Sequence, residues 1–146
     1  MRKSDDIDQL KDELEELFAG LCQAPRFVGQ RRVFRPLIDV FRTDDPPTLT
    51  VVVELAGVDP AEVELAVTDG VLAIFGKRVR ERVPGRVYQH IEIDYGAFGR
   101  RIPLSEPVDA DAAEATYARG LLTVVLPVAT RASGPVKVPV TRRATP

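Results

Sequence analysis

The chain has 146 residues, of which 45% are hydrophobic and 29% charged, and its formal net charge is -2 at pH 7. This length is enough for one domain with a buried core and short arms. The charge gives no reason to expect a nucleic acid partner, because phosphate binding needs a basic surface. The chain also has no run of about 18 apolar residues that could span a membrane.

The N-terminal sequence is too acidic for a secretory signal peptide, which has a basic start followed by an apolar run. The chain has one cysteine, Cys22, which cannot form an intramolecular disulfide. Together these features favour a cytoplasmic protein.

Residues 4–21 have the spacing of an amphipathic helix, with Ser4 as a suitable N-cap and with Gly20 and Pro25 to end it. The apolar stripe comprises Ile7, Leu10, Leu14, Leu17, Phe18 and Leu21. Its polar face is acidic, which argues against a helix on a membrane surface. Two interpretations stay open: the stripe packs on its own domain, or it meets another chain or a client.

From Phe34 to Pro127 the apolar period changes to two, which is typical of β-strands. Turn signals separate predicted strands at 33–44, 48–57, 63–67, 71–76, 87–93, 114–118 and 121–127. Asp69-Gly70 is a hairpin signal, because such turns need residues that accept a positive φ. Short strands without long helices between them predict a β-sandwich.

Two short segments between the strands could each form a single helical turn. In 58–63, Asp59 would cap the turn and Pro60 would take its first position. Residues 107–113 have a similar pattern. In residues 121–127, one alternating set should enter the core, and the pattern does not say which.

The tail after residue 128 has no pattern that could bury a face, and its Pro, Ser, Thr and Gly content predicts an extended, mobile segment. An apolar patch, Val136, Val138 and Val140, interrupts it. Pro139 fixes its own φ and biases Val138 toward an extended backbone. Val138 and Val140 should therefore project from the same side of a strand-like peptide.

A search for catalytic groupings finds little. The one histidine, His90, is expected on a strand face, and it has no ligand-like spacing to Cys22. No serine lies in a nucleophile elbow, and neither a P-loop nor a GxGxxG motif occurs. We therefore expect no enzyme, no metal and no cofactor.

Five blocks of the chain, in this order, match the motifs of one family. They are 51–65 (early strands), 69–78 (a hairpin), 95–101 (a Phe-x-Arg segment), 115–127 (an A-x-x-x-n-G-V-L signature) and 138–140 (an I/V-x-I/V motif). Together they resemble the small heat-shock protein (α-crystallin) family. Departures are Leu121 for valine, Arg119 for Asn or Asp, and Ile102-Pro103 for an aromatic-arginine pair. Pro103 is expected to end its strand early and loosen any network around Arg100.

The resemblance implies an all-β fold, an immunoglobulin-like β-sandwich over residues 33–128, with a helical arm over 1–32 and a flexible C-terminal extension over 129–146. It also implies a chaperone that binds unfolding proteins without ATP and builds larger oligomers from homodimers. The expected partners are therefore unfolded clients and further copies of the chain, and neither nucleic acid nor membrane.

The resemblance also assigns residues to roles. The tail of one subunit would fill a groove on another, with small residues on the strand before Gly120 leaving room for the tail valines. The expected anchors are Val138 and Val140, and the expected groove residues are Leu65, Val67, Ala113 and Ala115. The alternatives are that these are ordinary core residues, or that the tail folds back on its own domain.

Clients would bind the arm, and the partner subunit would bind a strand within the long connection 81–95. The expected client-binding residues are Leu10, Leu14, Leu17, Phe18 and Leu21, and the expected dimer residues are Tyr88, Ile91, Ile93 and Arg100. Two other functions remain open. A CS-domain-like co-chaperone adaptor would share the sandwich but would not need the tail motif, and a β-sandwich enzyme would need a polar pocket.

Overall fold

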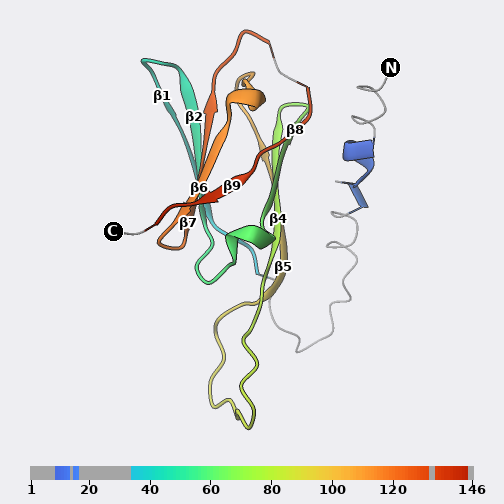
Figure 1. Ribbon diagram of the computed structural model, residues 1–146, viewed down its shortest axis with the longest axis vertical. Helices are drawn as coiled ribbons and strands as arrows, with labels where there is room; N and C mark the ends of the chain where they lie inside the picture. Colours follow the sequence, from blue (N-terminus) through green and yellow to red (C-terminus); the bar gives the residue numbers. More distant parts are fainter. Residues whose placement is uncertain (1–8, 14, 17–33, 132–133, 145–146) are drawn as a thin grey trace.

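Two β-sheets pack face to face in the computed structural model, which describes residues 9–13, 15–16, 34–131 and 134–144 (Figure 1). The five-stranded sheet has the order β1 (Ile38–Thr43), β2 (Thr48–Glu54), β7 (Leu121–Pro127), β6 (Glu114–Ala118) and β9 (Val140–Arg142). The four-stranded sheet has the order β5 (Gly96–Pro103), β4 (Val71–Arg78), β3 (Glu64–Thr68) and β8 (Val136–Lys137). This architecture confirms the predicted β-sandwich.

The core lies between the sheets and is built by alternation along each strand. On β7, Leu122, Val124 and Leu126 are buried, which decides which of the two alternating sets faces inward. Val124 lies opposite Val51 of β2 in the antiparallel register. The four-stranded sheet contributes Leu65, Val67, Leu72, Ile74, Phe98 and Ile102.

Two tight hairpin turns set the register of the neighbouring strands. Asp69 and Gly70 have φ values of 50° and 72°, and Arg119 and Gly120 have 51° and 79°. A two-residue turn with positive φ at both positions matches the twist of the strands that it joins. The predicted Asp69-Gly70 hairpin is confirmed, and Arg119 is a non-glycine residue in a left-handed conformation.

The two predicted helical turns are confirmed as the short helices η1 (Pro60–Glu62) and η2 (Ala110–Ala112). Asp59 caps η1, since its Oδ1 accepts a hydrogen bond of 3.0 Å from the Ala61 N–H. η1 lies between β2 and β3 and η2 lies between β5 and β6, so each helix connects one sheet to the other.

Residues 79–95 form a long loop between β4 and β5 that projects beyond the sandwich (Figure 1). Residues 87–93 form no strand within their own chain, because the segment extends away from both sheets, and the expected pairing of this segment with a partner subunit stays a prediction. His90 consequently lies in this loop and not on a strand face. Its Nε2 is 3.2 Å from Glu92 Oε1.

β5 was absent from the predicted strands because Gly96, Gly99 and Pro103 interrupt its apolar alternation. Its register with β4 holds through to Pro103, which lies opposite Val71. The expected early end of this strand is therefore wrong: proline terminates β5 only at its last position, where a missing N–H costs least.

Candidate functional site

The C-terminal tail crosses from one sheet to the other at their open edges (Figure 1). β8 pairs with β3 of the four-stranded sheet, and β9 pairs in parallel with β6 of the five-stranded sheet. Between these two short strands, the Val138 N–H donates a hydrogen bond of 3.0 Å to Leu65 O. One peptide thus covers two edges that would otherwise expose unpaired backbone groups.

The tail lies against residues that the sequence analysis assigned to the groove, here within its own domain. Val138 is only 4% exposed and belongs to the main core cluster, and Val140 is partly buried against the same cluster. Val138 belongs to the apolar patch that interrupts the tail, and it is the residue of that patch with the least exposure. The cluster also contains Leu65, Val67 and Ala115, with Ala113 packed against it.

Ala115 is the position where a small side chain matters most. Its Cα is the register partner of Val140, so the valine lies directly beside it across the β6–β9 ladder. Here the tail fills the groove of its own domain, which is the fold-back arrangement that the sequence analysis left open. The Pro139 between the two valines accounts for the gap between β8 and β9, since proline lacks the N–H that a ladder needs.

Gly120, in the turn after β6, is a position that disfavours a side chain for two reasons. Its φ is +79°, and a Cβ built on it would lie 3.2 Å from Ala56 Cα. Its carbonyl also accepts a hydrogen bond of 2.8 Å from the Leu55 N–H, which ties the β6–β7 turn to the end of β2. A side chain at this position would disturb that contact.

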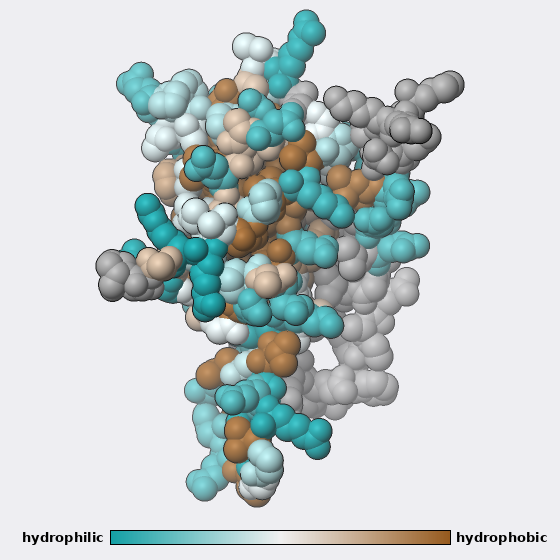
Figure 2. All heavy atoms as spheres, viewed as in Figure 1, coloured by the Kyte–Doolittle hydropathy of each residue, from teal (hydrophilic) through white to brown (hydrophobic). Residues whose placement is uncertain are grey.

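The β4–β5 loop, residues 79–95, carries exposed apolar side chains among charged ones (Figure 2). Val87 is 86% exposed and Ile93 is 60% exposed. The exposed apolar residues of this loop are Val79, Val83, Val87, Tyr88, Ile91 and Ile93. Three of the predicted dimer residues, Tyr88, Ile91 and Ile93, thus lie together on one projecting element.

Arginine side chains hold the base of this loop. The Arg78 guanidinium lies 3.5 Å from the centre of the Phe34 ring, and its Nε donates a hydrogen bond of 2.8 Å to Asp94 O. Arg80 lies 4.1 Å from the Tyr95 ring centre, and its Nη1 donates to the Tyr88 hydroxyl at 2.9 Å. Cation–π contacts and hydrogen bonds therefore join the two ends of the loop.

The Tyr88 hydroxyl is the point where two guanidinium groups meet, because Arg86 donates to it as well as Arg80. These donors lower the pKa of Tyr88, and Arg86 has the largest effect. Sequence reasoning missed this network. The signal that could have found it is the pairing of Arg78 and Arg80 on one side of the loop with Tyr88 and Tyr95 on the other.

Comparison with known proteins identifies the fold. A family model described as the Hsp20/alpha crystallin family matches residues 42–141. The chain belongs to this family. Its members, the small heat-shock proteins, are chaperones and not enzymes.

Individual relatives agree with this assignment. The chain is 37% identical to a 19.0 kDa class II heat shock protein of Oryza sativa subsp. japonica over 129 residues, which are 83% of this chain and 72% of that protein. The structure of heat shock protein 16.0 from Schizosaccharomyces pombe matches with a TM-score of 0.61 and 37% identity, covering 68% of this chain and 91% of that one.

A further solved structure is that of a small heat-shock protein from Xylella fastidiosa, described as revealing a distinct high order structure. It matches with a TM-score of 0.58 and 31% identity, covering 70% of this chain and 91% of that one. The range that the family model matches, residues 42–141, includes the tail segment with Val138 and Val140.

In this small heat-shock protein, Arg100 lies on β5 and contacts its own chain. Its Nη1 donates a hydrogen bond of 2.7 Å to Pro36 O, which links β5 to the segment before β1. Burial, and to a lesser extent the nearby Arg35, lower the pKa of Arg100. An ion pair across a dimer interface stays a prediction for this residue.

Of the predicted client-binding residues, Leu10 lies within the part of the chain that the structure describes. It packs against Ala66, Ala73 and Phe75 on the side of the four-stranded sheet that faces away from the core. Leu14, Leu17, Phe18 and Leu21 lie outside the described residues.

The described residues contain neither a group of metal ligands nor a helix that could span a membrane. Within 9–13, 15–16, 34–131 and 134–144, no three side chains of His, Cys, Asp or Glu gather in a way that could hold a metal ion. Over the same residues, no helix has the length and apolar character to cross a membrane.

Proposed function

We propose that this small heat-shock protein is an ATP-independent holdase, which binds unfolding proteins, prevents their aggregation and assembles from dimers into larger homo-oligomers. The observation that carries the proposal is the position of the C-terminal tail. This short segment pairs with β3 of one sheet and β6 of the other, and it buries Val138 between them. The segment can detach without unfolding the sandwich, because β3 and β6 keep their pairing with β4 and β7.

The tail supports assembly because its contacts do not depend on which chain supplies it. A neighbour's tail in this groove would form the same ladders with β3 and β6, as in an exchange of identical elements between protomers. Burial of Val138 and partial burial of Val140 contribute at most roughly 3–6 kcal/mol, while ordering the backbone costs about 1–2 kcal/mol per residue. One docked tail is therefore weak, and many tails together hold an oligomer through their high effective concentration.

The β4–β5 loop supports the dimer. Its exposed Val87, Ile91 and Ile93 form an apolar surface on an element with unpaired backbone groups. At the far edge of the five-stranded sheet, β1 also exposes Val40 and Phe41. We propose that the loop of one subunit pairs as a strand with the sheet of its partner, which would cover both surfaces.

The test of the proposed function is suppression of light scattering by a client protein that is heated or reduced, in the absence of nucleotide. A holdase lowers the scattering in proportion to its concentration, and the particle mass from light scattering exceeds that of a dimer. A chain that leaves client aggregation unchanged would refute the chaperone activity. A small particle of fixed mass would instead favour a CS-domain-like adaptor.

A further inference from the structure

The four-stranded sheet is apolar on both faces. β3 and β4 contain the runs Leu65–Val67 and Val71–Phe75, in which successive residues point to opposite faces. One set enters the core, and the other set forms a second buried cluster of Ala66, Ala73 and Phe75, called here the outer patch. Phe75 is only 5% exposed although it faces away from the core, so something must cover it.

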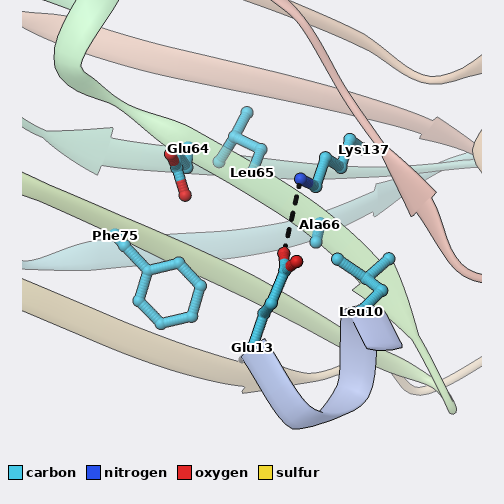
Figure 3. A pocket seen from close by; sticks show the side chains of 7 residues that line it. All are labelled: Leu10, Glu13, Glu64, Leu65, Ala66, Phe75 and Lys137. Carbon is cyan, nitrogen blue, oxygen red and sulfur yellow. Dashed lines mark ion pairs between the residues drawn. The ribbon is translucent and has the colours of Figure 1, made fainter. Parts of the chain in front are cut away.

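The cover includes the described part of the N-terminal arm. Leu10 packs against the outer patch, and Glu13, three residues later, projects from the same side of the helix toward the sheet (Figure 3). The described part of the arm, residues 9–13 and 15–16 and called here the arm helix, therefore lies on this face of the sheet, and its Leu10 contributes to the burial of the outer patch.

Two ion pairs flank the apolar contact. Lys11 Nζ lies 3.0 Å from Asp69 Oδ2, in the turn between β3 and β4. Lys137 Nζ lies 3.8 Å from Glu13 Oε2. All four side chains are substantially exposed, so each pair contributes at most about 1 kcal/mol.

The fit between helix and sheet is loose. A cavity of about 20 Å³ remains between them, lined by Leu10, Glu13, Glu64, Leu65, Ala66, Phe75 and Lys137 (Figure 3). A space of this size holds about one water molecule, so the helix and the sheet are not in continuous contact there. Weak ion pairs and incomplete packing together describe a helix that can leave the sheet without disrupting it.

Lys137 connects this helix to the tail. It lies on β8, opposite Ala66 of the outer patch, and immediately precedes the anchor Val138. Glu13 therefore faces a lysine only while a tail occupies the groove. Removing the tail would take away the ion pair and, with β8, the edge of the surface on which the helix lies.

We propose that the arm helix is a reversible cover on the outer patch and that a docked tail helps to hold it there, so that departure of the tail loosens the arm. Rupture of the contact between tail and groove would then expose the outer patch and Leu10 together. The inference rests on the proposed function only for its use in client capture, and its test involves no client.

The cover is tested with a thiol reporter. Ala73→Cys, in the full chain with Cys22→Ser, places a thiol on the outer patch, and its rate of labelling by a maleimide reports how often the patch is uncovered. Leu10→Ser should speed labelling by roughly tenfold, as expected from the loss of a partly buried leucine. Ala110→Cys, in the core, serves as the control for opening of the sandwich, and its rate should stay unchanged. Equal labelling of Ala73→Cys with and without Leu10→Ser overturns the cover, and Ala66→Cys is a second reporter if Ala73→Cys does not fold.

The coupling to the tail is tested in the same background. Lys137→Glu should speed labelling of the reporter about two- to fivefold, the range for an exposed ion pair, and adding Glu13→Lys should restore the slow rate. Arg142→Glu makes the same change of charge on β9 and should have no effect. A rate that is equal in Lys137→Glu and Arg142→Glu, or that Glu13→Lys does not restore, overturns the coupling.

A cross-link decides whose arm provides the cover. Leu10→Cys combined with Ala73→Cys and Cys22→Ser, treated with a short bifunctional maleimide, should give an internally cross-linked monomer that migrates faster on a denaturing gel than the untreated chain, and failure to form it would overturn the contact. A cross-linked dimer would mean that a neighbour's arm lies on the patch, which overturns the arrangement proposed here. If the chain fails to protect clients but gives the expected labelling and cross-linking results, the holdase proposal is wrong and the cover proposal stands.

Discussion

Arg119 is the residue whose backbone conformation fits its side chain least well. Its φ of 51° lies in the left-handed region, which costs an ordinary L-residue roughly 1–2 kcal/mol and asparagine less. The side chain is exposed, so little packing offsets this cost. Arg119→Asn should therefore raise the free energy of unfolding by about 0.5–1 kcal/mol.

Urea denaturation at matched protein concentration measures that change. Arg119→Ala is the control, because it removes the arginine side chain but keeps a Cβ at positive φ. The strain argument is wrong if the asparagine and alanine variants are equally stable.

Gly120, the next residue, should respond in the opposite direction. Its φ of +79° disfavours any side chain, and a Cβ would crowd Ala56 at 3.2 Å. Gly120→Ala should lower the free energy of unfolding by about 1–3 kcal/mol. Gly70→Ala is the comparison, since it has a similar φ of +72° but open space around the Cβ, so its loss in urea denaturation should be smaller. A larger loss at Gly70 would contradict the role of Ala56.

At the scale of elements, the tail should behave as a unit that can be detached. Val138→Ser with Val140→Ser removes both anchors and should leave the sandwich folded and dimeric while the assembly shrinks toward dimers. Multi-angle light scattering at matched concentration measures the particle mass. Thr141→Ala, an exposed change on the same strand, should leave that mass unaltered. An unchanged mass in the serine variant would exclude the valines as intersubunit anchors.

The β4–β5 loop should lose its pairing when a ladder donor is removed. Ile91 belongs to no strand of its own chain, so Ile91→Pro should leave the sandwich intact but weaken the dimer. Ile91→Ala is the control, because it keeps the backbone N–H and removes most of the side chain. It therefore shows how much of the effect comes from the lost apolar contact and how much from the lost ladder hydrogen bond. Normal sedimentation of the proline variant would show that the loop does not add a strand to the partner.

At the scale of the whole molecule, the arm should be dispensable for folding and needed for client protection. The core residue Phe34, which packs edge-on against Phe98 at 5.3 Å, lies just after the arm. Deleting residues 1–32 should leave the sandwich folded by circular dichroism, raise the binding of a hydrophobic dye through the bared outer patch, and weaken suppression of client scattering. Full protection by the shortened chain would place client binding elsewhere.

Much of the sandwich could be predicted because local rules decide it. The alternation around Val51 and Val124 and the Asp69-Gly70 turn carry their own register. The segment 87–93 has the same alternation, but a pattern does not say whether a partner strand is within reach. β5 was missed because Gly99 and Pro103 hide its pairing, which depends on β4 and not on local preference.

Sequence reasoning could predict the parts of the candidate site that depend on side-chain size. It could not predict the contacts that depend on how distant segments are placed in the fold. Ala115 and Val138 were expected together because a small residue leaves room for a larger one, and they share one cluster. The stacking of Arg78 on Phe34 joins residues 44 positions apart, which no spacing rule connects. The same holds for the lysine–glutamate contact between the two chain ends.

Because the tail lies in the groove of its own domain, assembly is an equilibrium between two species. In the closed species each tail occupies its own groove, and in the linked species it occupies the groove of a neighbour. If tails also dock on neighbours, each groove is occupied in both the closed and the linked species, and dilution converts one into the other without baring β3 and β6. The crossover then depends on the effective concentration of the chain's own tail relative to that of the several tails that together hold an oligomer. A cell could disperse such a protein by lowering its amount and never produce free sheet edges.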